Sequence, residues 1–170
     1  MANRDRNPQV DVLVLLGSLS DKPLAAEIKA VLDEFGVSAR YEVCSAHRDH
    51  GRLAKLVPEA EAAGAQVFIA AAGMAAHLPG VVAALTVRPV IGIPASSGLK
   101  GVDALLSIAQ MPPGIPVACV GIDAARNAAL LAVEILAISQ PALAAKLRDY
   151  RTGLALKNQS DSVELRQELE

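Results

Sequence analysis

One short segment, residues 45–48, combines side chains that can move a proton and hold a phosphate. His47 carries an imidazole, which titrates near neutral pH and can both accept and release a proton. The neighbouring Arg48 offers a planar fork of N–H donors that suits a phosphate. Each residue alone is also typical of a solvent-exposed loop, with Arg48 in a surface ion pair. Their chemistry becomes a site only if the fold gathers other polar groups around them.

A second polar segment, residues 17–21 (GSLSD), precedes a helical pattern. Free N–H groups at a helix start, together with two hydroxyls, form a site for an anion or a sugar phosphate. Asp21 would repel a phosphate, but its carboxylate can accept hydrogen bonds from ribose hydroxyls. The structural alternative is that Ser20 or Asp21 caps the following helix. The segment lacks the lysine of a P-loop and the three glycines of a dinucleotide-binding turn.

A third segment, residues 72–80, is built of small residues around one histidine. Gly73 would let a ligand approach backbone N–H groups closely. His77 is a candidate second acid or base, but we favour a helix-start histidine that bonds to the backbone. His50 is expected to be exposed in the first turn of a helix. The three histidines share no metal-type spacing and no cluster of acids accompanies them, so we expect no metal site.

The elements that must position these residues alternate along the chain. Their order predicts an α/β domain with a parallel sheet and helices on both faces. Ligands of such sheets bind at the carboxyl ends of the strands, where the three polar segments fall. We expect strands over 10–16, 37–44, 66–72, 89–93 and 116–120, and helices over 24–35, 53–60, 77–85, 102–109, 124–138 and 141–156.

Composition narrows the functional classes. The 170 residues are 52% apolar and 2% aromatic, with a formal net charge of −2. This excludes a disordered chain, and the scarcity of aromatic residues together with the absence of a basic stripe argues against nucleic acid as a partner. The apolar stretch 67–87 has the length of a membrane span, but its His, Pro and Gly residues favour a strand, a turn and a buried helix. The polar arm 1–9 has no secretion signal, so we expect a cytoplasmic protein.

The C-terminal third suggests assembly with other copies. The pattern over 124–138 is apolar nearly all round, which predicts cover from neighbouring subunits. The chain holds 32 alanines, which bury little area each, so its full core is expected only in the oligomer. The polar tail 157–170 is expected to fray. Cys44 and Cys119 lie in apolar runs and are expected to be buried thiols.

Five motifs in order, GSLSD, SAHR, GMAAHLPG, GVDALLSIAQMPPGIPV and NAALLAVEILA, resemble the N5-carboxyaminoimidazole ribonucleotide mutase family of purine biosynthesis. The similarity runs from about residue 10 to residue 137 and points to the bacterial-type class I branch. It implies a flavodoxin-like three-layer α/β/α sandwich with a five-stranded parallel sheet. It also implies a homo-octamer in which the C-terminal helix packs on a neighbouring subunit. The implied reaction moves a carboxylate from N5 to C4 of an aminoimidazole ring, without ATP, metal or organic cofactor.

The same resemblance gives roles to residues of this chain. His47 would be the general acid/base for loss of CO2 and its return to C4, with CO2 as a transient intermediate. Asp21 would bind the ribose hydroxyls. Ser45 and Arg48, helped by Ser20, would bind the 5′-phosphate. The remaining substrate-binding residues would be Ser18, Ala46, Gly73, Met74, His77 and Leu78.

Alternatives to the mutase remain open at this point. Met74 stands where many relatives have a second glycine, and Asp49-His50 replaces a common Thr-Pro. A sister branch carboxylates aminoimidazole ribonucleotide with free CO2, but it tends to have Lys in place of Arg48 and lacks the AAHLPG pattern. A more distant relative carboxylates a pyridine mononucleotide. A non-catalytic nucleotide-binding domain could share the fold, although phosphate binding alone would need only Arg48 and not His47.

Overall fold

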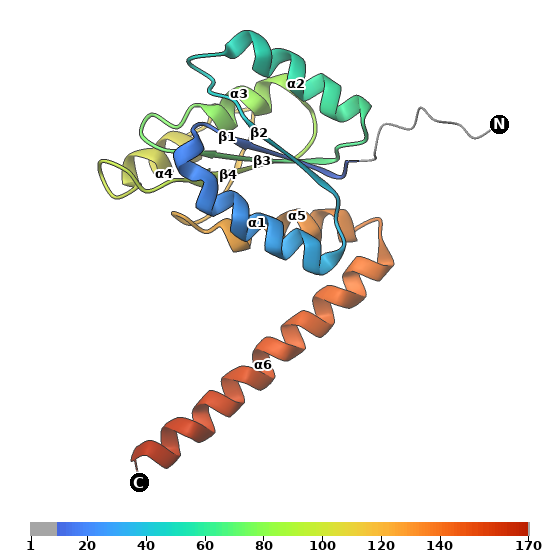
Figure 1. Cartoon of the computed structure of the whole chain (residues 1–170), viewed down its shortest axis with the longest axis vertical. Coiled ribbons are helices and arrows are strands. Elements are labelled where there is room, and N and C mark those ends of the chain that lie inside the picture. The colour runs from blue at the N-terminus through green and yellow to red at the C-terminus, as the bar shows by residue number, and fades with distance from the viewer. Residues whose placement is uncertain (1–9, 170) are drawn as a thin grey trace, which may run out of the picture.

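The computed structural model describes residues 10–169 and shows a parallel sheet of five strands in the order β2-β1-β3-β4-β5 (Figure 1). The predicted arm, residues 1–9, lies outside the described residues. All neighbouring strands pair in parallel, and Val12 of β1 aligns with Ala39 of β2 and Val67 of β3. The strands are β1 (Val12–Leu16), β2 (Ala39–Val43), β3 (Val67–Ala72), β4 (Val90–Pro94) and β5 (Ala118–Cys119).

The central strands are apolar because helices cover both of their faces. Every residue of β1, β3 and β4 is buried, as is usual in a parallel sheet with two covered faces. The two edge strands are shorter than the runs 37–44 and 116–120 predicted. In β5 only two residues pair, and Pro116, which has no N–H to donate to a ladder, lies just before them.

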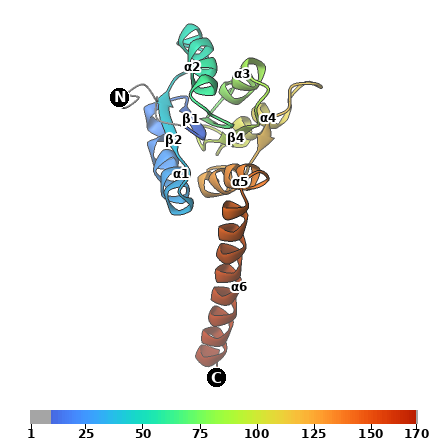
Figure 2. The same cartoon turned by 90° about the vertical axis from the view of Figure 1, so that its right-hand side faces the viewer.

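The helices form two layers, which confirms the predicted three-layer α/β/α class. Figure 2 shows α1 and α5 on one face of the sheet and α2 and α3 on the other, with α4 beside α3. Ile28, Leu32 and Val133 belong to the core of the first face, and Leu53 and Ile108 to that of the second. The helices are α1 (Lys22–Phe35), α2 (His50–Ala62), α3 (Leu78–Leu85), α4 (Val102–Ala109), α5 (Ala125–Ala137) and α6 (Pro141–Leu169).

Helix α5 obtains much of its cover from its own chain. Ala128, Ala129 and Ala132 are 0% exposed, in the core cluster that also contains residues of α1 and α6. Their small side chains allow α5 to approach α1 and the sheet closely. The expectation that α5 needs a neighbouring subunit for this cover, and that the core is complete only in an oligomer, is therefore wrong for these alanines.

The last helix, α6, extends far from the sheet (Figure 1). It runs over 29 residues to Leu169, so the expected frayed tail from residue 157 is instead helical. Residues 157–169 contain no Gly or Pro and are rich in Lys, Gln, Glu, Leu and Arg, which are good helix formers. Their polarity is compatible with an exposed helix, and only Leu143 and Leu147 of α6 are buried.

Two further expectations are settled by burial and helix length. Cys44 is buried, but Cys119 is only partly buried because it lies on the edge strand β5. The apolar stretch 67–87 divides into β3, a turn and α3, as predicted. Within residues 10–169, no helix combines the length and the apolarity needed to cross a membrane.

Candidate active site

The carboxyl ends of β1 to β4 surround a pocket of about 720 Å³. Parallel strands end on the same side of the sheet, so loops distant in sequence meet there. The structure brings all eleven residues named from the sequence to this pocket. They are Ser18, Ser20, Asp21, Ser45, Ala46, His47, Arg48, Gly73, Met74, His77 and Leu78.

Two histidines from different loops meet in the pocket. Nε2 of His47 lies 2.6 Å from Nδ1 of His77, and the two rings are nearly perpendicular at 82°. One ring must donate and the other accept, so this contact holds a single proton. The favoured expectation for His77, a bond to the backbone, is wrong: its side chain makes no helix-capping bond and faces His47 instead.

The loop after β1 is organised by Ser18 and Asp21. The Ser18 hydroxyl accepts a hydrogen bond from the Ser20 N–H at 3.3 Å, and Asp21 Oδ2 accepts one from the Ser18 N–H at 3.2 Å. This reciprocal pair caps a short 3-10 helix, Leu19–Asp21, that leads into α1. The capping expectation for Ser20 or Asp21 on α1 is therefore corrected, since Asp21 precedes α1 without a side-chain cap bond.

The carboxyl group of Asp21 holds its proton more tightly than usual. Partial burial raises its pKa above the ordinary 3.8, and the nearby Asp123 carboxylate adds to this rise. Hydrogen bonds from the Ser20 hydroxyl and the Ser18 N–H oppose the rise without cancelling it. Two carboxylates at one edge of the sheet disfavour a phosphate beside Asp21 and favour neutral hydroxyl groups there.

Arg48 joins the second loop to the first. Its Nη2 donates to the Gly17 carbonyl at 2.9 Å, and its backbone N–H donates to the Ser45 hydroxyl at 3.3 Å. Between residues 10 and 169, no carboxylate lies within ion-pair distance of its guanidinium, so the alternative of a surface ion pair is not observed. Arg48 thus lines the pocket, and a guanidinium there is suited to binding an anion.

The turn after β3 approaches the loop after β4 closely. A Cβ atom on Gly73 would lie 3.1 Å from Ser97 Oγ and 3.3 Å from the Ala95 carbonyl oxygen, so a larger residue would displace this loop. The Met74 N–H donates to Ser97 Oγ at 3.1 Å. Met74 itself has a φ of 56°, a left-handed conformation that glycine adopts more easily.

Comparison with known proteins assigns the chain to a family. Its sequence matches the AIR carboxylase family over residues 11–157. The chain belongs to the AIR carboxylase family.

Two curated proteins that are similar to this chain are both named N5-carboxyaminoimidazole ribonucleotide mutase. The protein from Pyrococcus abyssi is 56% identical over 139 residues, which cover 81% of this chain and 80% of that protein. The one from Methanocaldococcus jannaschii is 50% identical over 146 residues, covering 86% and 91%. The crystal structure of Treponema denticola PurE matches this fold with a TM-score of 0.83 at 31% identity, covering 91% of this chain and 97% of that one.

Some residues of the family member's pocket were missed by the reasoning from sequence. Ser96 and Ser97 line it from the loop after β4, and Asp123 accepts a hydrogen bond from the Ser96 N–H at 2.8 Å. The sequence indicated these strand ends, but serines without a neighbouring titratable group carried no signal of their own. Asp123 has a φ of 54°, which only the structure reveals.

The remaining polar candidates of this AIR carboxylase family member lie apart from the pocket. His50 begins α2 and is exposed, as expected. In the described part of the chain, no three His, Cys, Asp or Glu side chains gather in a group that could hold a metal ion. The pocket itself brings together the histidine pair, Arg48, several hydroxyls and the Asp21 carboxyl group.

Proposed function

We propose that this protein is an N5-carboxyaminoimidazole ribonucleotide mutase, an isomerase of purine biosynthesis. The observation that carries the proposal is the meeting of His47, His77, Arg48 and Asp21 around one pocket. A proton-transfer group and a phosphate-binding group at opposite ends of a sugar phosphate are what the reaction requires. The shared name of the curated relatives supports the same activity.

The substrate is oriented by its two polar ends. The Arg48 guanidinium, with the hydroxyls of Ser45 and Ser20, binds the 5′-phosphate. Asp21 accepts hydrogen bonds from the ribose hydroxyls, which carry no charge and so avoid the repulsion that a phosphate would meet. The imidazole base then points to the turn formed by Gly73 and Met74, next to the histidine pair.

His47 gives one proton and takes one back during the rearrangement. As the bond between N5 and the carboxylate breaks, CO2 leaves, and the electron pair stays on N5, which gains a proton supplied by His47. The electron-rich ring then forms a bond from C4 to CO2, and His47 removes the C4 proton to restore the aromatic ring. The contact with His77 orients the His47 ring for both transfers.

The apolar part of the pocket keeps CO2 close to C4. Ala72, Ala76 and Leu78 are buried side chains that offer no hydrogen bond to water. Confining CO2 beside the ring makes the second step effectively unimolecular. Excluding water also protects the intermediate from loss as bicarbonate.

One assay with two substrates tests the function. Purified protein is mixed with N5-carboxyaminoimidazole ribonucleotide, and separately with aminoimidazole ribonucleotide and bicarbonate, and the C4-carboxylated product is followed. The mutase produces it rapidly only from the first substrate. Rapid product from the second substrate would instead indicate the carboxylase, and no product from either would indicate a nucleotide-binding domain.

We also propose that the chain acts as one domain in a cytoplasmic homo-octamer. Helix α6 supports this proposal because it leaves several large apolar side chains exposed. A second copy of the chain packed along α6 would remove them from water. These side chains are Leu154, Leu156, Val163, Leu165 and Leu169.

A further inference from the structure

The loop that carries His47 and Arg48 leaves the sheet at an edge strand. β2 ends at Val43, and the Cys44 N–H donates to the Leu16 carbonyl of β1 at 2.9 Å. The Val43 carbonyl and the Cys44 N–H belong to one trans peptide group and point in opposite directions, so the Val43 carbonyl points away from β1. β2 is the edge of the sheet, and among residues 10–169 no strand pairs with this outer side.

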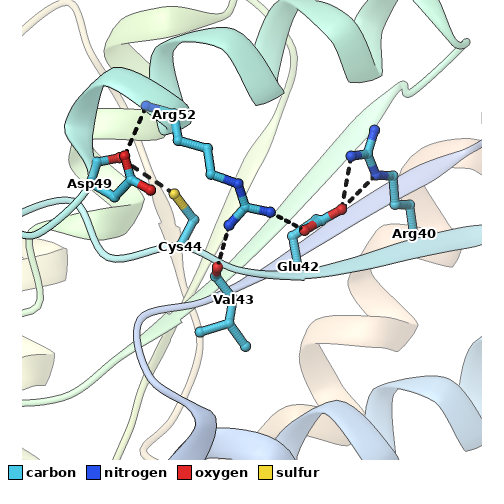
Figure 3. Close-up of polar contacts among 6 residues, drawn as sticks. All are labelled: Arg40, Glu42, Val43, Cys44, Asp49 and Arg52. Carbon is cyan, nitrogen blue, oxygen red and sulfur yellow. Dashed lines mark hydrogen bonds and ion pairs between the residues drawn. The ribbon is translucent and has the colours of Figure 1, made fainter.

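The guanidinium of Arg52 binds this outward-pointing carbonyl (Figure 3). Its Nη1 donates to the Val43 carbonyl at 2.8 Å, and its Nη2 donates to Glu42 Oε2 at 2.6 Å. Arg52 lies in the first turn of α2, where its backbone N–H donates to the Asp49 side chain at 3.2 Å. One residue thus ties the exit of β2 to the entry of α2.

Glu42 aims the fork of Arg52. Its Oε1 accepts hydrogen bonds from both Nε and Nη2 of Arg40, at 2.9 Å and 2.8 Å, and its Oε2 receives Arg52. The Glu42 side chain is 20% exposed, less than that of Arg40 at 38% or Arg52 at 45%. When Nη2 of Arg52 is bound to the Glu42 carboxylate, the planarity of the guanidinium directs Nη1 at the Val43 carbonyl.

Two more hydrogen bonds close the base of the same loop. The Asp49 N–H donates to the Ser45 carbonyl at 3.0 Å, and the Cys44 thiol lies 3.6 Å from the Asp49 carbonyl oxygen. The backbone of residues 44–49 is therefore fixed at its base. Any movement of the base displaces His47 and Arg48 at the pocket.

We infer that Arg52, aimed by Glu42, is a positioning residue for the proposed mutase reaction. Arg52 does not line the pocket, so it acts through the backbone of the loop rather than on the substrate. A shift of about 1 Å in a reacting group can cost about 100-fold in rate. Release of the Val43 carbonyl therefore disturbs both proton transfer by His47 and phosphate binding by Arg48.

Arg40 supplies a matched control. Both arginines pair with the carboxylate of Glu42, but only Arg52 also holds the Val43 carbonyl. We expect Arg52→Gln to lower kcat/KM by about 10-fold to 100-fold, with a lower kcat and a raised KM. Arg40→Gln is expected to change kcat/KM by less than about 2-fold. A mere loss of folded enzyme lowers the apparent kcat and leaves KM unchanged, so the rise in KM is the distinguishing measurement.

The kinetic comparison rests on the proposed mutase activity. Amide hydrogen exchange tests the same inference about Arg52 without requiring that activity. Exchange over residues 44–49 is expected to be at least about 10-fold faster in Arg52→Gln and unchanged in Arg40→Gln. Equal exchange and equal kinetics in the two variants would overturn the inference. A wild-type protein that leaves N5-carboxyaminoimidazole ribonucleotide unchanged would overturn the proposed function alone, since exchange still decides the role of Arg52.

A conservative variant covers the case in which Arg52→Gln does not fold. Lysine in Arg52→Lys keeps the positive charge, but its single nitrogen cannot bridge Glu42 and the Val43 carbonyl as a fork does. We expect this variant to lie between the wild type and Arg52→Gln in kcat/KM, or about 3-fold to 10-fold below the wild type, with faster exchange over residues 44–49. Kinetics and exchange equal to those of the wild type would overturn the inference.

Discussion

At the scale of single residues, the site depends on pairs of polar groups that lie close together. His47 and His77 share a proton at 2.6 Å, and Asp21 stands near Asp123 at the edge of the sheet. Each member of these pairs lies in the immediate electrostatic or hydrogen-bonding surroundings of the other. Substitution of one member therefore changes the chemistry of the other, and this can be measured.

Replacement of His47 separates proton transfer from binding. We expect His47→Asn to lower kcat for the mutase reaction by about 100-fold to 10,000-fold, the usual contribution of a general acid/base. Affinity for aminoimidazole ribonucleotide, measured by calorimetry, is expected to stay within about 3-fold because Arg48 and Asp21 are unchanged. His77→Asn serves as the comparison and should lose less kcat. Near-normal turnover in His47→Asn would contradict the assigned role.

Replacement of Asp21 tests the effect of burial on its carboxyl group. Since the folded protein holds this proton more tightly than the unfolded chain, the stability that Asp21 contributes is present below pH 3.8 and is lost as pH rises through its raised folded-state pKa. Asp21→Asn, which carries no charge, is therefore expected to melt at a higher temperature than the wild type at pH 7. The difference should shrink as the pH falls toward 4.

Substrate affinity provides the second measurement on the same variant. An amide accepts hydrogen bonds from hydroxyls more weakly than a carboxylate, so Asp21→Asn should bind aminoimidazole ribonucleotide more weakly. Higher stability together with weaker binding in Asp21→Asn would show that the Asp21 charge serves binding at a cost in stability. If Asp21→Asn were less stable than the wild type, and by the same amount at pH 7 and at pH 4, the idea that the Asp21 charge costs stability would be refuted.

At the scale of elements, the site depends on close approach between loops and between layers. The turn at Gly73 and Met74 rests on Ser97, and β4 approaches α4 at Gly92. At each contact the glycine carries only a hydrogen where a larger residue would have a Cβ atom, and that Cβ atom would meet a close neighbour. Substitutions there test whether packing or backbone conformation governs the local structure.

The left-handed conformation of Met74 predicts an unusual gain from glycine. A non-glycine residue in this conformation costs about 1–2 kcal/mol, and glycine adds about 0.5–1 kcal/mol of unfolded-chain entropy. Met74→Gly should therefore raise the free energy of unfolding by about 0.5 kcal/mol, measured with urea. Ala75→Gly is the control, because Ala75 has a negative φ and should only lose stability. Equal losses in both variants would show that Met74 is not strained.

The contact of β4 with α4 leaves no space for a methyl group. A Cβ atom on Gly92 would lie 2.5 Å from Ile108 Cγ2 and 3.1 Å from Val117 Cγ1. Gly92→Ala is expected to lower the free energy of unfolding by about 1–3 kcal/mol, measured by urea denaturation. Gly51→Ala is the control, since nothing lies within 4 Å of its added Cβ atom in α2. It should be stabilising by about 0.5–1 kcal/mol, and a similar loss in both would exclude the steric explanation.

At the scale of the whole molecule, the projecting helix α6 leaves apolar side chains without cover in a single chain. Only Leu143 and Leu147 of α6 are buried, close to its first turns. Beyond them α6 stands away from the sheet (Figure 2). A helix of this length gains stability when another surface covers its apolar residues.

Removal of residues 157–170 tests the proposed assembly. The shortened chain keeps the sheet and both core clusters, so its circular dichroism should retain an α/β spectrum with less helix. Sedimentation analysis is expected to show fewer copies per particle than the full chain, because Val163, Leu165 and Leu169 are lost from the contact. A shortened chain that still forms the same octamer as the full chain would contradict a role of this segment in assembly.

The sequence by itself determined the order of strands and helices and the edge at which the polar residues meet. Short apolar runs bounded by loop residues favour strands buried on both faces, and the polar residues after such strands then share the carboxyl edge. This reasoning placed the loops around His47 and Asp21 correctly. It did not reveal the roles of Ser97 or Asp123, because the backbone N–H groups that their side chains bind lie 23 and 27 positions away in other loops.

Only the tertiary structure decided how these residues contact one another. His47 and His77 are 30 positions apart, and β1 lies between β2 and β3, the strands that lead to them, so no local pattern predicts their hydrogen bond. The sequence also could not show that Arg52 would satisfy the outward carbonyl of an edge strand. Periodicity reports which face of an element is buried, whereas hydrogen-bond partners across the fold depend on the register and separation of packed elements.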